Sequence, residues 1–106
     1  LLNHANIDIN KQNKDNWTVL MLTCRNSNTT SNNETVKLLL NDANIDINKQ
    51  NKDGWTALMI ACRYSNTESN NETVKLLLHQ PNIYVNKQQK EGWTALMLAC
   101  ENSNTE

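Results

Sequence analysis

Apolar residues in this chain recur with helical spacing in some segments and with alternating spacing in others. Within residues 56–65, apolar residues lie one, four and five positions after Ala57, which places them on one stripe of a helix. The stripe consists of Ala57, Leu58, Ala61 and Cys62. Because most of these side chains are small, the pattern predicts a helix that packs closely against its neighbours.

A second helix is predicted over residues 69–78, SNNETVKLLL. Ser69 and Glu72 have the spacing of a capping box, in which the serine caps the first turn and the glutamate reaches back to it. The apolar edge of this helix consists of Val74, Leu77 and Leu78. Ser31 and Glu34 repeat the same spacing earlier in the chain, so the same helix is expected there.

Between the predicted helices, residues 44–54 read NIDINKQNKDG and alternate Ile45 and Ile47 with polar neighbours. The segment ends at Gly54, directly after an aspartate, which is typical of a short extended finger closed by a turn. Asn16 stands at the equivalent position earlier in the chain and can also adopt a positive φ, at some cost relative to glycine.

The whole pattern repeats every 38 residues, as the tryptophans Trp17, Trp55 and Trp93 show. Residues 5–42 and 43–80 form two full units, 81–106 form a partial third, and 1–4 match the end of a preceding unit. We therefore expect the chain to be part of a longer array. One helix pair cannot bury its apolar face alone, so the repeat predicts an all-α solenoid of stacked helix pairs with short fingers.

Composition excludes several function classes. The 106 residues carry a formal net charge of −1, so no overall field attracts nucleic acid or an anionic membrane. No apolar run approaches the roughly 18 residues of a spanning helix, and no secretory signal is recognisable. We expect an intracellular protein of the cytoplasm that binds neither nucleic acid nor membrane.

The three cysteines, Cys24, Cys62 and Cys100, occupy the same position in successive units. Equivalent residues on stacked units lie about 8–10 Å apart, whereas a disulfide needs Cα atoms within about 7 Å. The sequence thus predicts reduced thiols packed as small apolar groups inside the stack. His4 and His79 do not have zinc-site spacing relative to these cysteines, so no metal is expected.

No arrangement of residues in the sequence indicates a catalytic site. Two glycines in the whole chain cannot build a phosphate cradle, so no nucleotide or other cofactor is expected. Cys62 could pair with His79 as a nucleophile, but its place on the packed stripe favours burial. The acids Asp46 and Asp53 have no constant equivalents, and a solenoid offers them no deep pocket. The sequence predicts no enzyme activity.

The residues of the 38-residue unit resemble the ankyrin repeat. The signature of that repeat is a turn, a glycine, a variable residue and an inner helix that begins with threonine. Gly54, Thr56, Leu58 and Ala61 match that signature, VKLLL from Val74 matches the outer helix, and IDIN matches the family's β-hairpin. The family's inner-helix proline and histidine are replaced by alanine or valine and by methionine. The 38-residue step also exceeds the usual repeat of about 33, mostly in the SNTESNN segment between the helices.

The resemblance implies a module that binds another protein through its fingers and inner helices, without catalysis. The family's variable positions, carried onto this sequence, give the partner-binding residues that we expect. They are Gln12, Lys14, Asp15, Trp17, Arg25 and Asn26 in the first unit, Gln50, Lys52, Asp53, Trp55, Arg63 and Tyr64 in the second, and Gln88, Lys90, Glu91, Trp93, Glu101 and Asn102 in the third.

Several alternatives stay open. The array could be a structural spacer, or it could recruit substrate for an enzyme elsewhere in a larger protein. Positive residues recur on the fingers and helix ends together with the four acids Asp15, Asp53, Glu91 and Glu101, which favours an acidic partner segment over simple solvated lysines. The positive residues are Lys11, Lys14, Lys49, Lys52, Lys87, Lys90, Arg25 and Arg63. The tryptophan row could be a structural ladder, or a binding surface with Trp55 as its anchor.

Overall fold

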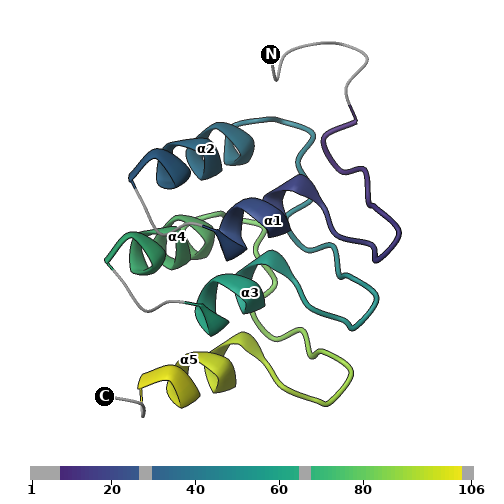
Figure 1. Ribbon diagram of the computed structural model, residues 1–106, viewed down its shortest axis with the longest axis vertical. Coiled ribbons are helices and arrows are strands. Elements are labelled where there is room, and N and C mark those ends of the chain that lie inside the picture. Colours follow the sequence, from purple (N-terminus) through teal and green to yellow (C-terminus); the bar gives the residue numbers. More distant parts are fainter. Residues whose placement is uncertain (1–7, 27–29, 65–67, 104–106) are drawn as a thin grey trace.

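The computed structural model of the chain describes residues 8–26, 30–64 and 68–103. Within these segments lie five α-helices: α1 (Val19–Arg25), α2 (Thr30–Leu40), α3 (Ala57–Arg63), α4 (Glu68–Leu78) and α5 (Ala95–Ser103). Figure 1 shows α1, α3 and α5 stacked as an inner layer and α2 and α4 as an outer layer, with the fingers projecting to one side. The predicted all-α solenoid is confirmed.

Each inner helix begins at a threonine that follows the tryptophan of its unit. The threonine hydroxyl accepts a hydrogen bond from the backbone N–H three residues further on, at 3.2–3.3 Å. These threonines are Thr18, Thr56 and Thr94. The bond satisfies one of the N–H groups that the first turn of a helix leaves without an intrahelical partner, so threonine fixes where the helix starts.

The outer helices begin earlier than the sequence pattern predicts. α2 and α4 start at Thr30 and Glu68, one residue before the serines that were expected to cap them. Ser31 and Ser69 therefore lie within the first helical turn, so the predicted start of each outer helix is one residue too late. The side chains of both serines lie outside the described residues.

The core is centred on α3, which lies between α1 and α5 and also packs against α4 (Figure 1). All residues from Ala57 to Cys62 are buried, so the predicted stripe is confirmed and burial extends right around the helix. The apolar stripe predicts only one covered face, and the neighbouring units cover the others.

Burial at the ends of the stack depends on whether a neighbouring unit is present. Leu58 is 2% exposed in α3, which has helices on several sides, while Leu96, its equivalent in α5, is 72% exposed. At the other end of the stack, Val19 is 44% exposed, whereas its equivalent Ala57 is 2% exposed against α1. Each unit thus completes the core of the one before it, as expected for a solenoid with nearest-neighbour stabilisation.

A buried polar contact joins the outer helices. The side-chain amide of Asn33 in α2 donates to the hydroxyl of Thr73 in α4 at 2.7 Å, and both residues are buried. We expect Asn33→Ala to lower the free energy of unfolding by about 1–3 kcal/mol, because it removes a buried hydrogen-bonding partner. Asn71 occupies the same position in α4 but is exposed, so Asn71→Ala is the matched control and should cost less than about 0.5 kcal/mol. Urea denaturation of both variants measures the difference, and equal losses would contradict a role for the Asn33 contact.

The fingers are built from turns rather than from β-hairpins. No β-strand occurs in residues 8–26, 30–64 or 68–103, so the hairpin that the family resemblance implied is not observed. The turn backbone has a positive φ at the expected positions, 66° at Asn16, 87° at Gly54 and 88° at Gly92, which confirms that prediction. Many polar groups of the fingers bond to side chains, and this replaces the cross-strand pairing of a hairpin.

Candidate functional site

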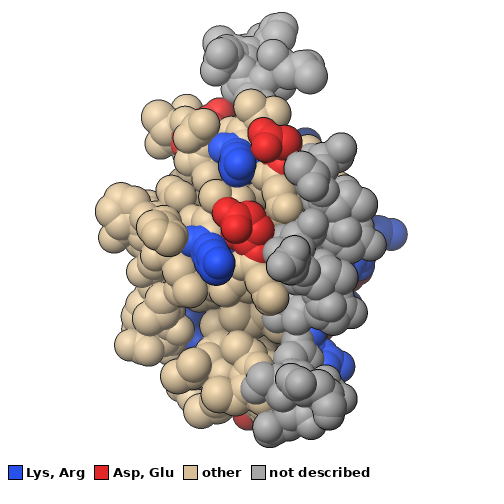
Figure 2. Space-filling model, turned by 90° about the vertical axis from the view of Figure 1, so that its left-hand side faces the viewer, with Lys and Arg blue, Asp and Glu red and all other residues tan. Residues whose placement is uncertain are grey.

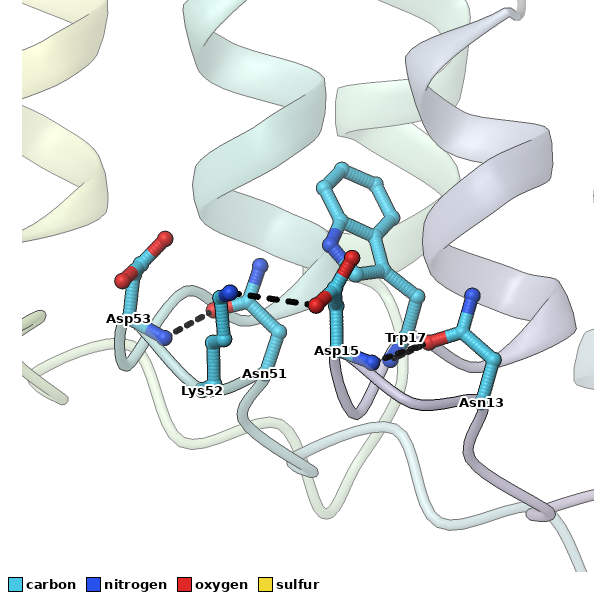
Figure 3. A network of polar contacts seen from close by, with 6 residues as sticks. All are labelled: Asn13, Asp15, Trp17, Asn51, Lys52 and Asp53. Carbon is cyan, nitrogen blue, oxygen red and sulfur yellow. Dashed lines mark hydrogen bonds and ion pairs between the residues drawn. The ribbon is translucent and has the colours of Figure 1, made fainter.

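The tip of each finger is held by one amide side chain. In the first finger, Asn13 Oδ1 accepts hydrogen bonds from the backbone N–H groups of Asp15 and Trp17, both at 2.9 Å (Figure 3). Asn51 makes the same two bonds to Asp53 and Trp55, at 2.9 and 3.0 Å. Gln89 makes them in the third finger, at 2.6 and 3.1 Å. This position therefore sets where the acid and the tryptophan of each unit lie.

A glutamine ladder ties each finger to the next. The amide Nε2 of Gln12 donates within its finger to Asn16 O at 2.8 Å and across to Gln50 O at 3.2 Å. Gln50 repeats both bonds, to Gly54 O at 2.7 Å and to Gln88 O at 3.2 Å. The three glutamines that we predicted to contact a partner thus have a structural task in the stack.

An asparagine ladder runs beside it. Asn10 Nδ2 donates to Asn44 O at 2.7 Å, and Asn10 Oδ1 accepts from the backbone N–H of Asp46 at 2.7 Å. Asn48 makes the equivalent bonds with Asn82 O and with the N–H of Tyr84, at 3.0 and 2.9 Å. The fingers are consequently fixed relative to one another as a continuous surface.

The finger tips carry charges that partly neutralise one another. Lys52 Nζ lies 3.1 Å from Asp15 Oδ1 of the preceding finger, and both side chains are more than half exposed (Figure 3). The hydrogen bond and charge of Asp15, together with the charge of Asp53, raise the pKa of Lys52. Asp8 and Asp46 also lie on the fingers, where they accept bonds from the N–H groups two residues on. The positive excess is therefore smaller than our count from the sequence.

The tryptophans lie where the fingers meet the inner helices. Trp17, Trp55 and Trp93 are all partly buried and pack against the core. In Figure 3 the ring of Trp17 points from the turn toward the helices. The guanidinium carbon of Arg25 lies 5.0 Å from the centroid of this ring. Each ring thus contributes to the stack and keeps part of its surface in solvent. In the first unit the cation–π contact joins finger and helix end into one surface.

The ends of the inner helices differ in charge and size from unit to unit. Arg25 and Asn26, then Arg63 and Tyr64, are exposed, and Glu101 is exposed in the third unit. The side chain of Asn102 lies outside the described residues. We refer to the exposed finger tips, the tryptophans and these helix ends as the finger–helix face.

The surface over the outer helices has a different character. In Figure 2, basic and acidic side chains lie next to each other at successive levels of this surface. Lys37 and Glu34 of α2 form an exposed ion pair one helical turn apart, with Nζ and Oε2 separated by 3.3 Å. Exposed pairs of this kind contribute little stability or specificity, so this surface is less distinctive than the finger–helix face.

These features have the order that a repeat family requires: a positive-φ turn, a threonine cap, an inner helix and an outer helix. The sequence matches the family model described as ankyrin repeats (3 copies) over residues 1–88. The chain belongs to the ankyrin-repeat family. A comparison with curated proteins found no match. Ankyrin repeats are generally protein–protein interaction modules, and the family is generally non-catalytic.

The described part of this ankyrin array contains no group of three or more His, Cys, Asp or Glu residues that could hold a metal ion. His79 is exposed, and its Nδ1 lies 2.7 Å from the carbonyl oxygen of Lys75, while His4 lies outside the described residues. None of the described helices is both long and apolar enough to cross a membrane.

The cysteines of the array have two different environments. Cys24 and Cys62 are buried, as predicted, and burial raises the pKa of their thiols from 9.0 to about 12 and about 11. Cys100 is exposed, so the prediction that all three cysteines are buried is wrong for this one. All three cysteines are free of disulfide bonds in this structure.

We expect one thiol to react quickly with a maleimide at neutral pH and two to react only after denaturation. Cys100 is the fast site, because its sulfur is accessible, and peptide mass mapping identifies it. Fast native labelling of Cys62 would contradict the burial.

The same two thiols make stability depend on pH. Above about pH 9 the unfolded chain releases protons that the folded chain retains at Cys24 and Cys62, so the free energy of unfolding should fall as the pH rises.

Proposed function

We propose that this ankyrin array binds a partner protein through its finger–helix face. The observation that carries the proposal is the contrast between a constant frame and a variable surface. The ladders through Gln12 and Asn10 recur in the next unit, at Gln50 and Asn48, where each side chain bonds to the equivalent backbone groups one unit further on. Above this frame, the exposed helix ends change from one unit to the next.

A rigid frame favours binding because the surface needs little ordering when the partner arrives. The variable side chains then determine specificity, since they differ in charge and size across the units. Tryptophan, tyrosine and arginine are the residue types most enriched in binding hot spots, and Trp55, Tyr64 and Arg63 supply all three in the central unit. Tyr64 is 46% exposed, so it is available to a partner without repacking of the core.

The charge of the face favours a partner with an acidic segment. Lys14, Lys90 and Arg25 are exposed, whereas Lys52 already pairs with Asp15. The excess of positive charge is modest, so we expect it to guide the partner and adjust affinity rather than to dominate binding. Such attraction weakens as salt screens the charges.

The proposal is tested with a partner isolated by affinity capture on the folded chain. Trp55→Ala and Tyr64→Ala are made separately, and circular dichroism confirms that each variant folds. We expect at least one of them to lose about 2 kcal/mol or more of binding free energy, as for a hot-spot residue. Affinity should also fall between low and physiological ionic strength.

Lys37→Ala is the matched control, because Lys37 is exposed but lies on the outer helices. This variant should bind with the affinity of the original chain. Loss of binding in Lys37→Ala together with unchanged binding in both finger–helix variants would overturn the proposal. Binding that does not respond to ionic strength would remove the acidic segment from it.

A further inference from the structure

The tryptophans of the finger–helix face present hydrogen-bond donors to solvent. The backbone N–H of each tryptophan is bonded to the amide side chain that holds its finger, but no indole N–H forms a hydrogen bond within the part of the chain that the structure describes. The same described residues contain no buried side-chain polar atom without a partner. The indole nitrogens of this tryptophan row, in Trp17, Trp55 and Trp93, must therefore each reach solvent.

The tryptophan row is open in every unit rather than only at an end of the stack. Trp55 of the central unit is partly buried, as are Trp17 and Trp93 in the flanking units. The residue eight positions further along the chain, near the end of the inner helix, is exposed in all three units. These residues are Arg25, Arg63 and Glu101. Stacking of the units therefore leaves the row and the adjoining helix ends accessible at each level.

The spacing of these donors favours one backbone conformation in a ligand. The inner helices α1, α3 and α5 pack in succession, so equivalent positions on them lie about 8–10 Å apart. A polyproline II segment has three residues per turn and rises about 3.1 Å per residue, so every third carbonyl returns to the same side after about 9.3 Å. Its carbonyls have no internal hydrogen bonds, whereas those of an α-helix are already bonded within the helix. The carbonyls on one edge of a β-strand recur after only about 6.6–6.8 Å.

The helix ends add an ordered set of charges to the row. Arg25 lies over the ring of Trp17, with its guanidinium carbon 5.0 Å from the ring centroid. Arg63 and Glu101 hold the equivalent positions in the second and third units. The order of charge along the stack is therefore positive, positive, negative. A segment that carries an acidic, an acidic and a basic side chain at successive third positions complements this order.

We propose that the partner segment bound by this face is a polyproline II helix that runs along the stack, with one turn on each unit. The inference rests on the proposed function, because it describes the ligand of the same face. Each indole N–H of the row donates to one carbonyl in each turn of the segment, and prolines of the segment pack on the accessible parts of the rings. Two acidic side chains of the segment meet Arg25 and Arg63, and a basic side chain meets Glu101.

The test measures the binding of synthetic peptides to the folded chain by isothermal titration calorimetry. The probe peptide repeats Asp-Pro-Pro twice and ends in Lys-Pro-Pro, with both ends blocked, and is made in both sequence directions. The control peptide has the same composition, but its two aspartates and its lysine are adjacent. We expect one direction of the probe to bind about tenfold more tightly than the control, because only the probe matches every unit at once.

Two variants separate the donors from the charges. Trp55→Phe keeps an aromatic ring in the row and removes one indole N–H, so it should weaken the probe about threefold to tenfold. Arg63→Glu should weaken the probe and strengthen a second probe in which lysine replaces the central aspartate. Lys75→Glu is the matched control, because Lys75 is exposed on the outer helix α4, and it should leave both affinities unchanged. Circular dichroism confirms that each variant folds.

The outcomes for the peptides and for the captured partner are distinguishable. Absence of peptide binding, equal binding of the probe and the control peptide, or unchanged probe binding by Trp55→Phe and Arg63→Glu would overturn the polyproline II inference. None of these results bears on the proposed function, which is judged by the captured partner and the variants Trp55→Ala, Tyr64→Ala and Lys37→Ala. Tighter binding of the probe, with the expected response to Trp55→Phe and Arg63→Glu, supports the inference.

Discussion

Replacing Leu58 with alanine should lower the free energy of unfolding by about 2–5 kcal/mol, the range for a buried leucine that leaves a cavity. Leu58 is 2% exposed, in an inner helix with packed neighbours on both sides. Leu58 lies in α3, which packs against α1, α4 and α5, so the cavity would weaken the packing of the central inner helix. Urea denaturation followed by circular dichroism measures the change.

The same substitution one unit later is a control supplied by the chain itself. Leu96 occupies the equivalent helix position but is 72% exposed, so Leu96→Ala should change the free energy of unfolding by less than about 0.5 kcal/mol. Adding a further unit after residue 106 should raise the thermal midpoint, and Leu96→Ala should become costly in the longer array. Similar losses for Leu58→Ala and Leu96→Ala in the original chain would contradict nearest-neighbour stacking.

Gly54→Ala should be the second large loss, because two costs act at one position. Gly54 has a φ of 87°, which an alanine adopts at a cost of about 1–2 kcal/mol. A Cβ there would also lie 3.0 Å from the Cα of Gln89 and from the backbone nitrogen of Lys90. Backbone atoms of the next finger cannot yield as a flexible side chain would, so overpacking adds about 1–3 kcal/mol.

Gly92→Ala separates the two costs. Gly92 has nearly the same φ, 88°, but a Cβ there would meet only the side-chain amide of Gln88, at 3.8 Å. This variant should lose only the conformational part, about 1–2 kcal/mol. Asn16→Gly should gain up to about 1 kcal/mol, since Asn16 holds a φ of 66° with a side chain present. Equal losses for Gly54→Ala and Gly92→Ala, measured by thermal denaturation, would contradict the close finger contact.

The repeat made most of the fold predictable. A 38-residue period, the stripe through Leu58 and the turn at Gly54 each follow from short-range rules, and all agree with the structure. Local predictions fail at the fingers, at the starts of the outer helices and at Cys100. The outer helices start one residue before Ser31 and Ser69, because an N-cap motif alone does not determine where a helix begins in its tertiary context.

Position in the stack accounts for the failure at Cys100. The repeat alone predicts one environment for all three cysteines, whereas burial depends on the helices that surround each one, and α5 has fewer described neighbours than α1 or α3. The ladders were missed for a related reason. Gln12 reaches a carbonyl 38 residues away and Asn10 reaches one 34 residues away, so these bonds depend on how units stack. A sequence signal does exist, since an asparagine or glutamine recurs at each of these positions, as it does at Asn13, Asn51 and Gln89.

Hydrogen–deuterium exchange of the chain with and without its captured partner tests the central proposal most directly. If the finger–helix face binds the partner, peptides that cover the finger residues 46–56 and the end of α3 should exchange more slowly in the complex. Exchange in peptides that cover α2 and α4 should be unchanged, apart from any uniform slowing caused by stabilisation of the whole chain. Protection concentrated on the outer helices, with exchange in the fingers unaltered, would contradict the account.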